Sequence, residues 1–173
     1  MITVIGTSPG RSEWAADCLA SVPGEAVVVS VPGFELAKLQ WVLDNTTFKR
    51  FLFLQDSVTV SEALYARLSD FEGSVALLSD PVPFGCYLGV YERKVLEAVG
   101  IPQISTKREA VEAEIWWTQA YVKAAGQVPV LFPELTDRNA KRHAVRHGRE
   151  NLVLENDCLV KFKGTWRHDQ IVD

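Results

Sequence analysis

Short apolar runs alternate with helix-like stretches along most of this 173-residue chain. The runs are nearly continuous instead of alternating with polar residues, which is typical of strands buried on both faces of a sheet. Four of them occupy residues 3–5, 26–31, 51–54 and 75–78. This order predicts an α/β fold with a mostly parallel sheet flanked by helices.

The stretches between these runs carry local helix signals. Apolar residues three or four positions apart predict a helix over 34–43. Thr106 and Glu109 have the spacing of a capping box. We expect the longest helix to begin there and to run to about residue 125, where Gly126 occupies the C-terminal cap position.

Polar residues directly follow two of the predicted strands. Residues 7–11 read Thr-Ser-Pro-Gly-Arg after the first strand, and Gln55, Asp56 and Ser57 follow the third. In α/β sheets ligands bind beyond the carboxyl ends of the strands, so this edge is the predicted functional site. The chain lacks G-x-x-x-x-G-K-[ST] and G-x-G-x-x-G. The common ATPase and dehydrogenase motifs are therefore absent.

The net charge of −4 is unevenly distributed. Residues 1–137 carry 10 Lys and Arg against 17 Asp and Glu, whereas residues 138–173 carry 8 against 5. We interpret 1–173 as a single domain with a basic C-terminal segment, 138–173. The acidic body argues against a general nucleic-acid coat, while the basic segment permits a local anion site.

Two further patterns bear on where the protein works. No apolar run reaches the roughly 18–20 residues of a membrane span, and the N-terminus lacks the pattern of a signal peptide. The three cysteines lie far apart, and no pair has metal-ligand spacing. We therefore expect a cytoplasmic protein with reduced thiols and no membrane span.

Four segments, taken in order, are similar to those of a known enzyme family. They are a strand and loop ending in Arg11 before the run Cys18-Leu19-Ala20-Ser21, the strand 51–57 with its acid, the segment 92–100, and the acid-rich helix ending at Gly126. Over roughly residues 2–135 they resemble a short form of the family-two-like nucleotide-sugar glycosyltransferases of the A-type (GT-A) fold. The resemblance implies inverting transfer of a sugar from a nucleotide-diphosphate donor to an acceptor hydroxyl, dependent on Mn²⁺ or Mg²⁺.

The resemblance also implies roles for individual residues. Asp56 would hold the metal ion, while Thr7, Arg11 and Gln55 would contact the nucleotide sugar. The family's paired acids are reduced to one here, which weakens metal binding or shifts part of the charge stabilisation to basic side chains. Other interpretations stay open: Asp56 as a cap of the following helix, and Arg11 as the partner of a nearby surface acid.

Two acids on the long helix are candidates for the general base that deprotonates the acceptor hydroxyl. Glu112 and Glu114 lie about 200° apart around a helix, so they cannot both face one site. Counting back from Gly126 places Glu114 at the first acid of the family's Glu-Asp pair, with Ile115 in the second place. We rank Glu114 above Glu112. Either acid could instead be solvated near the helix start.

The basic segment supplies the remaining candidates. His147 shares a predicted helix face with His143 and is a candidate metal ligand. Lys161 and Lys163 could neutralise a diphosphate, with Trp166 packed on a ring of the donor. For the face that carries His143 and His147, the alternatives are contact with phosphate or acceptor and a solvated cationic face. For Lys161 and Lys163, the alternative is an exposed C-terminal strand whose lysines protect its edge.

The leading hypothesis is therefore a glycosyltransferase acting on a small molecule or on a macromolecule, including modified nucleic acid. A non-catalytic binding or interaction module on the same fold is the first alternative, and the single strand-end acid favours it. A nucleotidyltransferase is the second, and it would release pyrophosphate instead of a nucleoside diphosphate.

Overall fold

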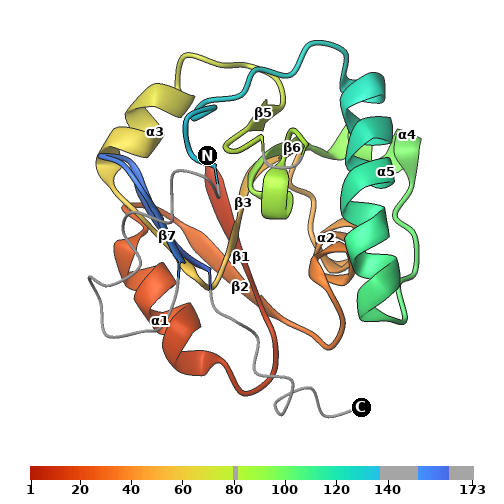
Figure 1. The fold of residues 1–173 in the computed structure, drawn as a ribbon, viewed down its shortest axis with the longest axis horizontal. Helices are drawn as coiled ribbons and strands as arrows, with labels where there is room; N and C mark the ends of the chain where they lie inside the picture. The colour runs from red at the N-terminus through yellow and green to blue at the C-terminus, as the bar shows by residue number, and fades with distance from the viewer. Residues whose placement is uncertain (80–81, 137–151, 164–173) are drawn as a thin grey trace.

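The computed structural model describes residues 1–79, 82–136 and 152–163 (Figure 1). Strands and helices alternate through the first half of the chain, as the apolar runs predict. The elements are β1 (Ile2–Thr7), α1 (Ser12–Ser21), β2 (Ala26–Ser30), α2 (Glu35–Asn45), β3 (Arg50–Gln55), β4 (Val58–Val60), α3 (Glu62–Leu68), β5 (Val75–Ala76), the 3-10 turn η1 (Gly85–Tyr87), β6 (Gly89–Glu92), α4 (Arg93–Val99), α5 (Lys107–Ala125), β7 (Leu152–Glu155) and β8 (Leu159–Lys163).

The main sheet has the strand order β2-β1-β3-β6-β5. β1 pairs in parallel with β2 and β3, whereas β6 runs antiparallel to both β3 and β5. The α/β prediction is confirmed, but the expected mostly parallel sheet is wrong for half of its strand pairings. In the described part of the connection from β5 to β6, the only helix is the three-residue η1. Without a crossover helix the chain turns back beside β5, and the two strands pair antiparallel.

Helices cover both faces of this sheet. Leu52 and Leu54 of β3 pack with α1 and α3 on one face, whereas Phe51 and Phe53 pack with α2, α4 and α5 on the other. Neighbouring side chains of a strand point to opposite faces, so a strand covered on both sides is apolar at every position. Burial on both faces thus explains why residues 51–54 of β3 are all apolar.

The longest helix, α5, begins and ends where its local signals predict. The Thr106 hydroxyl accepts the Glu109 N–H at 3.2 Å, and the Glu109 carboxylate accepts the Thr106 N–H at 3.1 Å. Gly126 adopts φ 84° directly after the helix, a conformation that glycine takes at little cost. Neither α5 nor any other helix in the described part of the chain is long and apolar enough to span a membrane.

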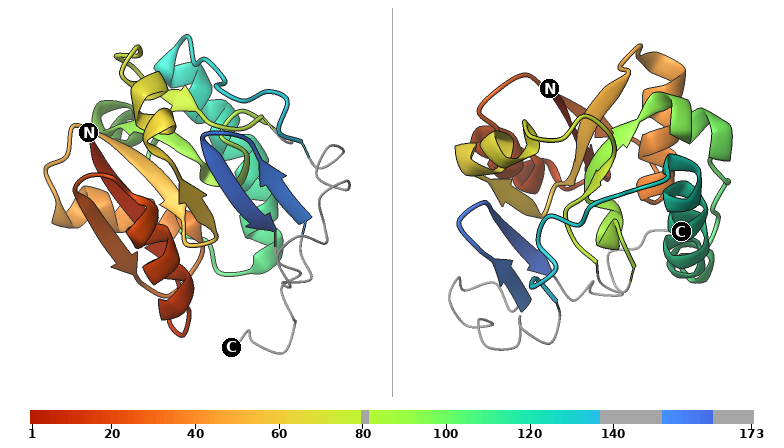
Figure 2. Two further views of the ribbon diagram at one scale, coloured as in Figure 1. Left: turned by 90° about the vertical axis from the view of Figure 1, so that its left-hand side faces the viewer. Right: turned by 90° about the horizontal axis from the view of Figure 1, so that it is seen from above.

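A second, antiparallel sheet joins distant parts of the chain in the order β4-β8-β7. Val58 of β4 lies opposite Lys161 of β8, and the Phe162 N–H donates to the Ser57 carbonyl at 2.9 Å. In Figure 2 the hairpin of β7 and β8 is the blue pair of arrows. This pairing carries Lys161 to the end of β3, about one hundred residues earlier in the chain.

Candidate functional site

The site begins where β1 and β3 end side by side. Gly6 lies opposite Gln55, and the Asp56 N–H donates to the Gly6 carbonyl at 3.0 Å. The next side chains therefore meet: the Thr7 hydroxyl donates to Asp56 Oδ2 at 2.8 Å, and Arg11 Nη2 lies 2.9 Å from Asp56 Oδ1. Thr7, Arg11 and Asp56, which the sequence predicts at strand ends, are therefore in contact. Asp56 bonds to this strand edge and does not cap α3, whose N-cap residue Ser61 makes no side-chain cap bond either.

Asp56 is 5% exposed, and each of its carboxylate oxygens has a partner. Burial raises the pKa of Asp56, while the Arg11 guanidinium and the Thr7 hydroxyl oppose that shift. Arg11 also lies over the Trp14 ring, 5.0 Å from its centroid. The carboxylate therefore serves to hold Arg11 in place at the end of β1.

Gln55 connects the strand end to two further charged residues. Its Nε2 donates to Glu35 Oε1 at 2.6 Å, and its Oε1 accepts a hydrogen bond from the Lys161 ammonium. Lys161 is 3% exposed and also lies 3.5 Å from the Ser57 hydroxyl oxygen. The pairing of β8 with β4 thus brings the predicted Lys161 into the same cluster.

Sequence reasoning missed two members of this cluster, Glu35 and Lys38 of α2. Lys38 is 3% exposed, and its ammonium donates to the Gly33 carbonyl and to the Ser8 hydroxyl, the latter at 3.3 Å. Burial lowers the pKa of Lys38, and the charges of Glu35 and Asp56 oppose this. Both residues follow β2, and the rule that ligands bind at strand ends would have found them had it been applied to that strand.

A pocket of about 300 Å³ adjoins the cluster at the carboxyl ends of β1 and β2. Thr7 and Ser8 line it and contact Asp56 and Lys38, respectively. The rest of the wall consists of small, polar and aliphatic residues: Gly10, Ser12, Ala15, Ala16, Leu19, Val28 and Ser30. Its volume lies at the lower end of the range for small-molecule sites.

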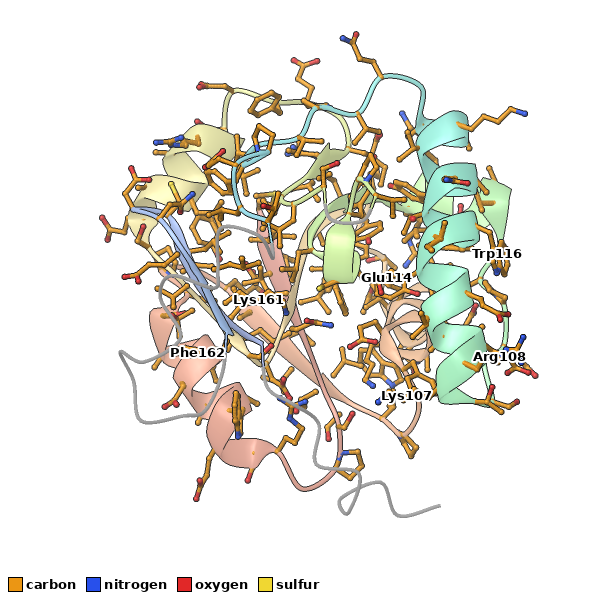
Figure 3. The ribbon with its side chains drawn as sticks, in the orientation of Figure 1. Lys107, Arg108, Glu114, Trp116, Lys161 and Phe162 are labelled. Atoms are coloured by element: carbon orange, nitrogen blue, oxygen red, sulfur yellow. The ribbon has the colours of Figure 1, made fainter. Side chains whose placement is uncertain are left out.

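The two candidate bases lie on different sides of α5, as their spacing predicts. Glu114 is half-buried, and its Oε1 accepts the Cys86 N–H at 2.6 Å. Glu112 is exposed and pairs with Arg108 at 2.8 Å. In Figure 3 Glu114 lies on the side of α5 that faces η1, and Arg108 lies on the opposite side. Only Glu114 is therefore directed toward the body of the protein.

Glu114 supports a backbone segment with unusual geometry. Phe84, Cys86 and Tyr87 have φ of 63°, 55° and 58°, values that non-glycine residues rarely adopt. The contact of Glu114 with the Cys86 N–H and a bond from the Tyr87 hydroxyl to the Ala110 carbonyl hold this turn against α5. Strained backbone of this kind is found preferentially at functional sites. Burial raises the pKa of Tyr87, and the charges of Glu114 and Glu35 add to that shift.

The three cysteines should differ in reactivity. Burial and the nearby Asp56 raise the pKa of Cys18 to about 12, and burial raises that of Cys158. Cys86 is half-buried, whereas the other two are buried. We expect iodoacetamide at pH 8 to modify Cys86 first in the native protein, and all three in urea. Mass spectrometry of timed samples checks this order, and equal native rates would contradict the burial described above.

Some predicted site residues fall outside what the structure describes. These are His147, with His143, and Trp166, together with the side chain of Lys163. Their roles in metal binding and in contact with the donor stay predictions.

The expected Mn²⁺ or Mg²⁺ does not fit the described donor groups well. Asp56 already has a partner on each oxygen, and three cationic side chains, Arg11, Lys38 and Lys161, lie around it. Within residues 1–79, 82–136 and 152–163, no three His, Cys, Asp or Glu side chains form a group that could hold a metal ion. The requirement for a divalent ion therefore stays a prediction, which the titrations below test.

Comparison with known proteins adds no family to these observations. A scan against protein-family models finds no match, and a search of curated proteins finds none either. What the site does is therefore inferred from its own residues.

Proposed function

We propose that this chain is a nucleotide-sugar-dependent glycosyltransferase whose donor binds at the carboxyl edge of β1, β2 and β3. The observation that carries the proposal is the convergence of five predicted donor-site residues on one cluster. They are Thr7, Arg11, Gln55, Asp56 and Lys161. The adjoining pocket of about 300 Å³ suits a compact part of the donor, such as its nucleoside or its sugar.

The charges of the cluster suit a donor that leaves as a diphosphate. Arg11, Lys38 and Lys161 outnumber Asp56 and Glu35 there, although residues 1–137 as a whole are acidic. Negative charge develops on the leaving diphosphate as the glycosidic bond breaks. Cations fixed in a desolvated site stabilise that charge without rearranging during the reaction.

Glu114 is the proposed general base. It would accept the proton of the acceptor hydroxyl as that oxygen attacks the anomeric carbon from the face opposite the diphosphate, which inverts the configuration. The Cys86 N–H donates to Oε1 of Glu114 at 2.6 Å and so orients the carboxylate beside the η1 turn. The acceptor is a small molecule or a macromolecule, modified nucleic acid included. None of the three cysteines forms a disulfide, in keeping with a cytoplasmic enzyme.

A thermal-shift titration with UDP, GDP, TDP and CDP, each with Mn²⁺ and with EDTA, tests the proposal. We expect one nucleotide to stabilise the protein, by roughly 2.7 kcal/mol at 100 times its Kd. Asp56→Asn, which gives up the charge that holds Arg11, should lose most of this shift. Lys123→Met, on the exposed last turn of α5, should keep it. No shift with any of the four in a folded protein would contradict the donor site.

A non-catalytic module is the competing proposal, because Asp56 is fully occupied by Thr7 and Arg11. A module would bind its partner without turning over a donor. Asp56→Ala separates the two proposals. An enzyme would stop releasing nucleoside diphosphate. A module releases no nucleoside diphosphate in either form and would still bind its partner.

A further inference from the structure

The geometry points to Lys38 and Lys161 as a diphosphate-binding site that works without a divalent metal ion. This inference rests on the proposed function and names the groups that neutralise the leaving phosphates. Lys38 comes from α2 and Lys161 from β8, and both ammonium groups reach the carboxyl edge of the main sheet. Each side chain belongs to a residue that is only 3% exposed.

Both ammonium groups contact only neutral oxygens in the described structure. Lys38 bonds to the Gly33 carbonyl and the Ser8 hydroxyl. Lys161 bonds to the amide oxygen of Gln55 and lies 3.5 Å from the Ser57 hydroxyl. An ammonium group has three N–H donors, so each lysine keeps one for a further acceptor.

The nearby carboxylates are held by other partners. Asp56 is bound by Arg11 and Thr7, and Glu35 accepts from Gln55. Neither lies within ion-pair distance of Lys38 or Lys161 among the described residues. The charges of Glu35 and Asp56 act on Lys38 only from beyond ion-pair distance, and a buried cation without a direct ion pair is costly to a folded protein. Two such cations at one sheet edge are therefore explained by an anion that arrives with the ligand.

The two lysines stand at neighbouring strand ends. Lys38 contacts Ser8, just past β1, and Lys161 contacts Ser57, just past β3. β1 and β3 are adjacent, and adjacent strands lie about 4.8 Å apart. We place the diphosphate across these two strand ends, with one phosphoryl group at each ammonium. Asp56 is then a positioning residue that orients Arg11. The diphosphate does not require a metal ion bound to Asp56.

Calorimetric titration of the full chain with inorganic pyrophosphate in EDTA tests the site directly. We expect binding without added metal, and at least tenfold weaker binding in Lys38→Met and in Lys161→Met, about the loss expected for a charged hydrogen bond. Lys123→Met removes an exposed lysine and should leave the Kd unchanged. Thermal melts establish that each variant is folded. The wild-type titration in EDTA decides metal dependence even where a variant does not fold.

The outcomes separate this inference from the proposed function. Pyrophosphate binding that requires Mn²⁺, or an unchanged Kd in both folded Met variants, would overturn the lysine site. If a nucleoside diphosphate binds only with Mn²⁺, the glycosyltransferase proposal stands and the lysine site fails. If pyrophosphate binds in EDTA through both lysines but no nucleoside diphosphate binds, the anion site stands and the donor proposal fails.

Discussion

Replacing Glu114 by Gln is expected to lower donor turnover by about 100- to 10,000-fold, the usual contribution of a general base. The amide has nearly the shape of the carboxylate and keeps an oxygen to accept the Cys86 N–H, so the strained turn should persist. It cannot accept a proton at neutral pH. The measurement is release of nucleoside diphosphate with water as the acceptor, which needs no knowledge of the natural acceptor. Binding of the nucleoside diphosphate should be unchanged.

Glu112→Gln is the matched control, because the same change is made two residues away on the same helix. Glu112 pairs with Arg108 on the exposed side of α5, and its loss should leave turnover unchanged. Equal effects of the two variants would show that neither acid is the base. A large effect of Glu112→Gln alone would reverse our ranking of the two acids.

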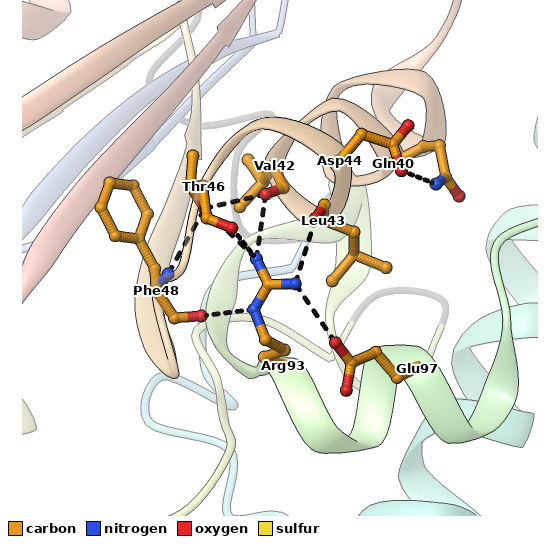
Figure 4. A network of polar contacts seen from close by, with 8 residues as sticks. All are labelled: Gln40, Val42, Leu43, Asp44, Thr46, Phe48, Arg93 and Glu97. Carbon is orange, nitrogen blue, oxygen red and sulfur yellow. Dashed lines mark hydrogen bonds and ion pairs between the residues drawn. The ribbon is translucent and has the colours of Figure 1, made fainter.

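Arg93→Ala is expected to lower the free energy of unfolding by about 3–4 kcal/mol, at the upper end for a single substitution. Arg93 donates to the carbonyls of Val42, Leu43, Thr46 and Phe48, at distances of 2.6–3.1 Å (Figure 4). Hydrogen bonds from a charged donor each contribute about 1.5–3 kcal/mol but are not additive. The cation also lies at the C-terminal end of α2, where the helix dipole favours positive charge.

Lys94→Ala controls for the loss of a neighbouring cation. The Lys94 side chain is 79% exposed and pairs with Glu92 at 2.9 Å, so we expect a change below about 1 kcal/mol. Urea denaturation of both variants measures the difference. Equal losses would mean that the carbonyl contacts of Arg93 contribute little. Because α2 carries Glu35 and Lys38, a destabilised α2 should also weaken pyrophosphate binding.

Much of the fold was predictable because its signals are local. Continuous apolar runs predicted β1, β2 and β3. Burial on both faces explains the run of β3. The expected burial of β2 on both faces is wrong, because β2 is an edge strand and its Val28 is 39% exposed. The capping box at Thr106 and Glu109 located α5 for the same reason: its partners are three residues apart. The spacing of Glu112 and Glu114 likewise predicted their separation around the helix. The strand-end rule placed Thr7 and Asp56 at one edge, where they do meet.

Tertiary structure alone decided which distant residues complete that edge. Lys161 reaches Gln55 only because β8 pairs with β4, and no local pattern encodes a pairing across about one hundred residues. The direction of β6 likewise depended on the lack of a crossover helix before it in the described chain. Residue types and strand ends are properties of short segments, so sequence determined them. The partners of a buried charge depend on which segments pack together, and the free energy of the whole fold selects that packing.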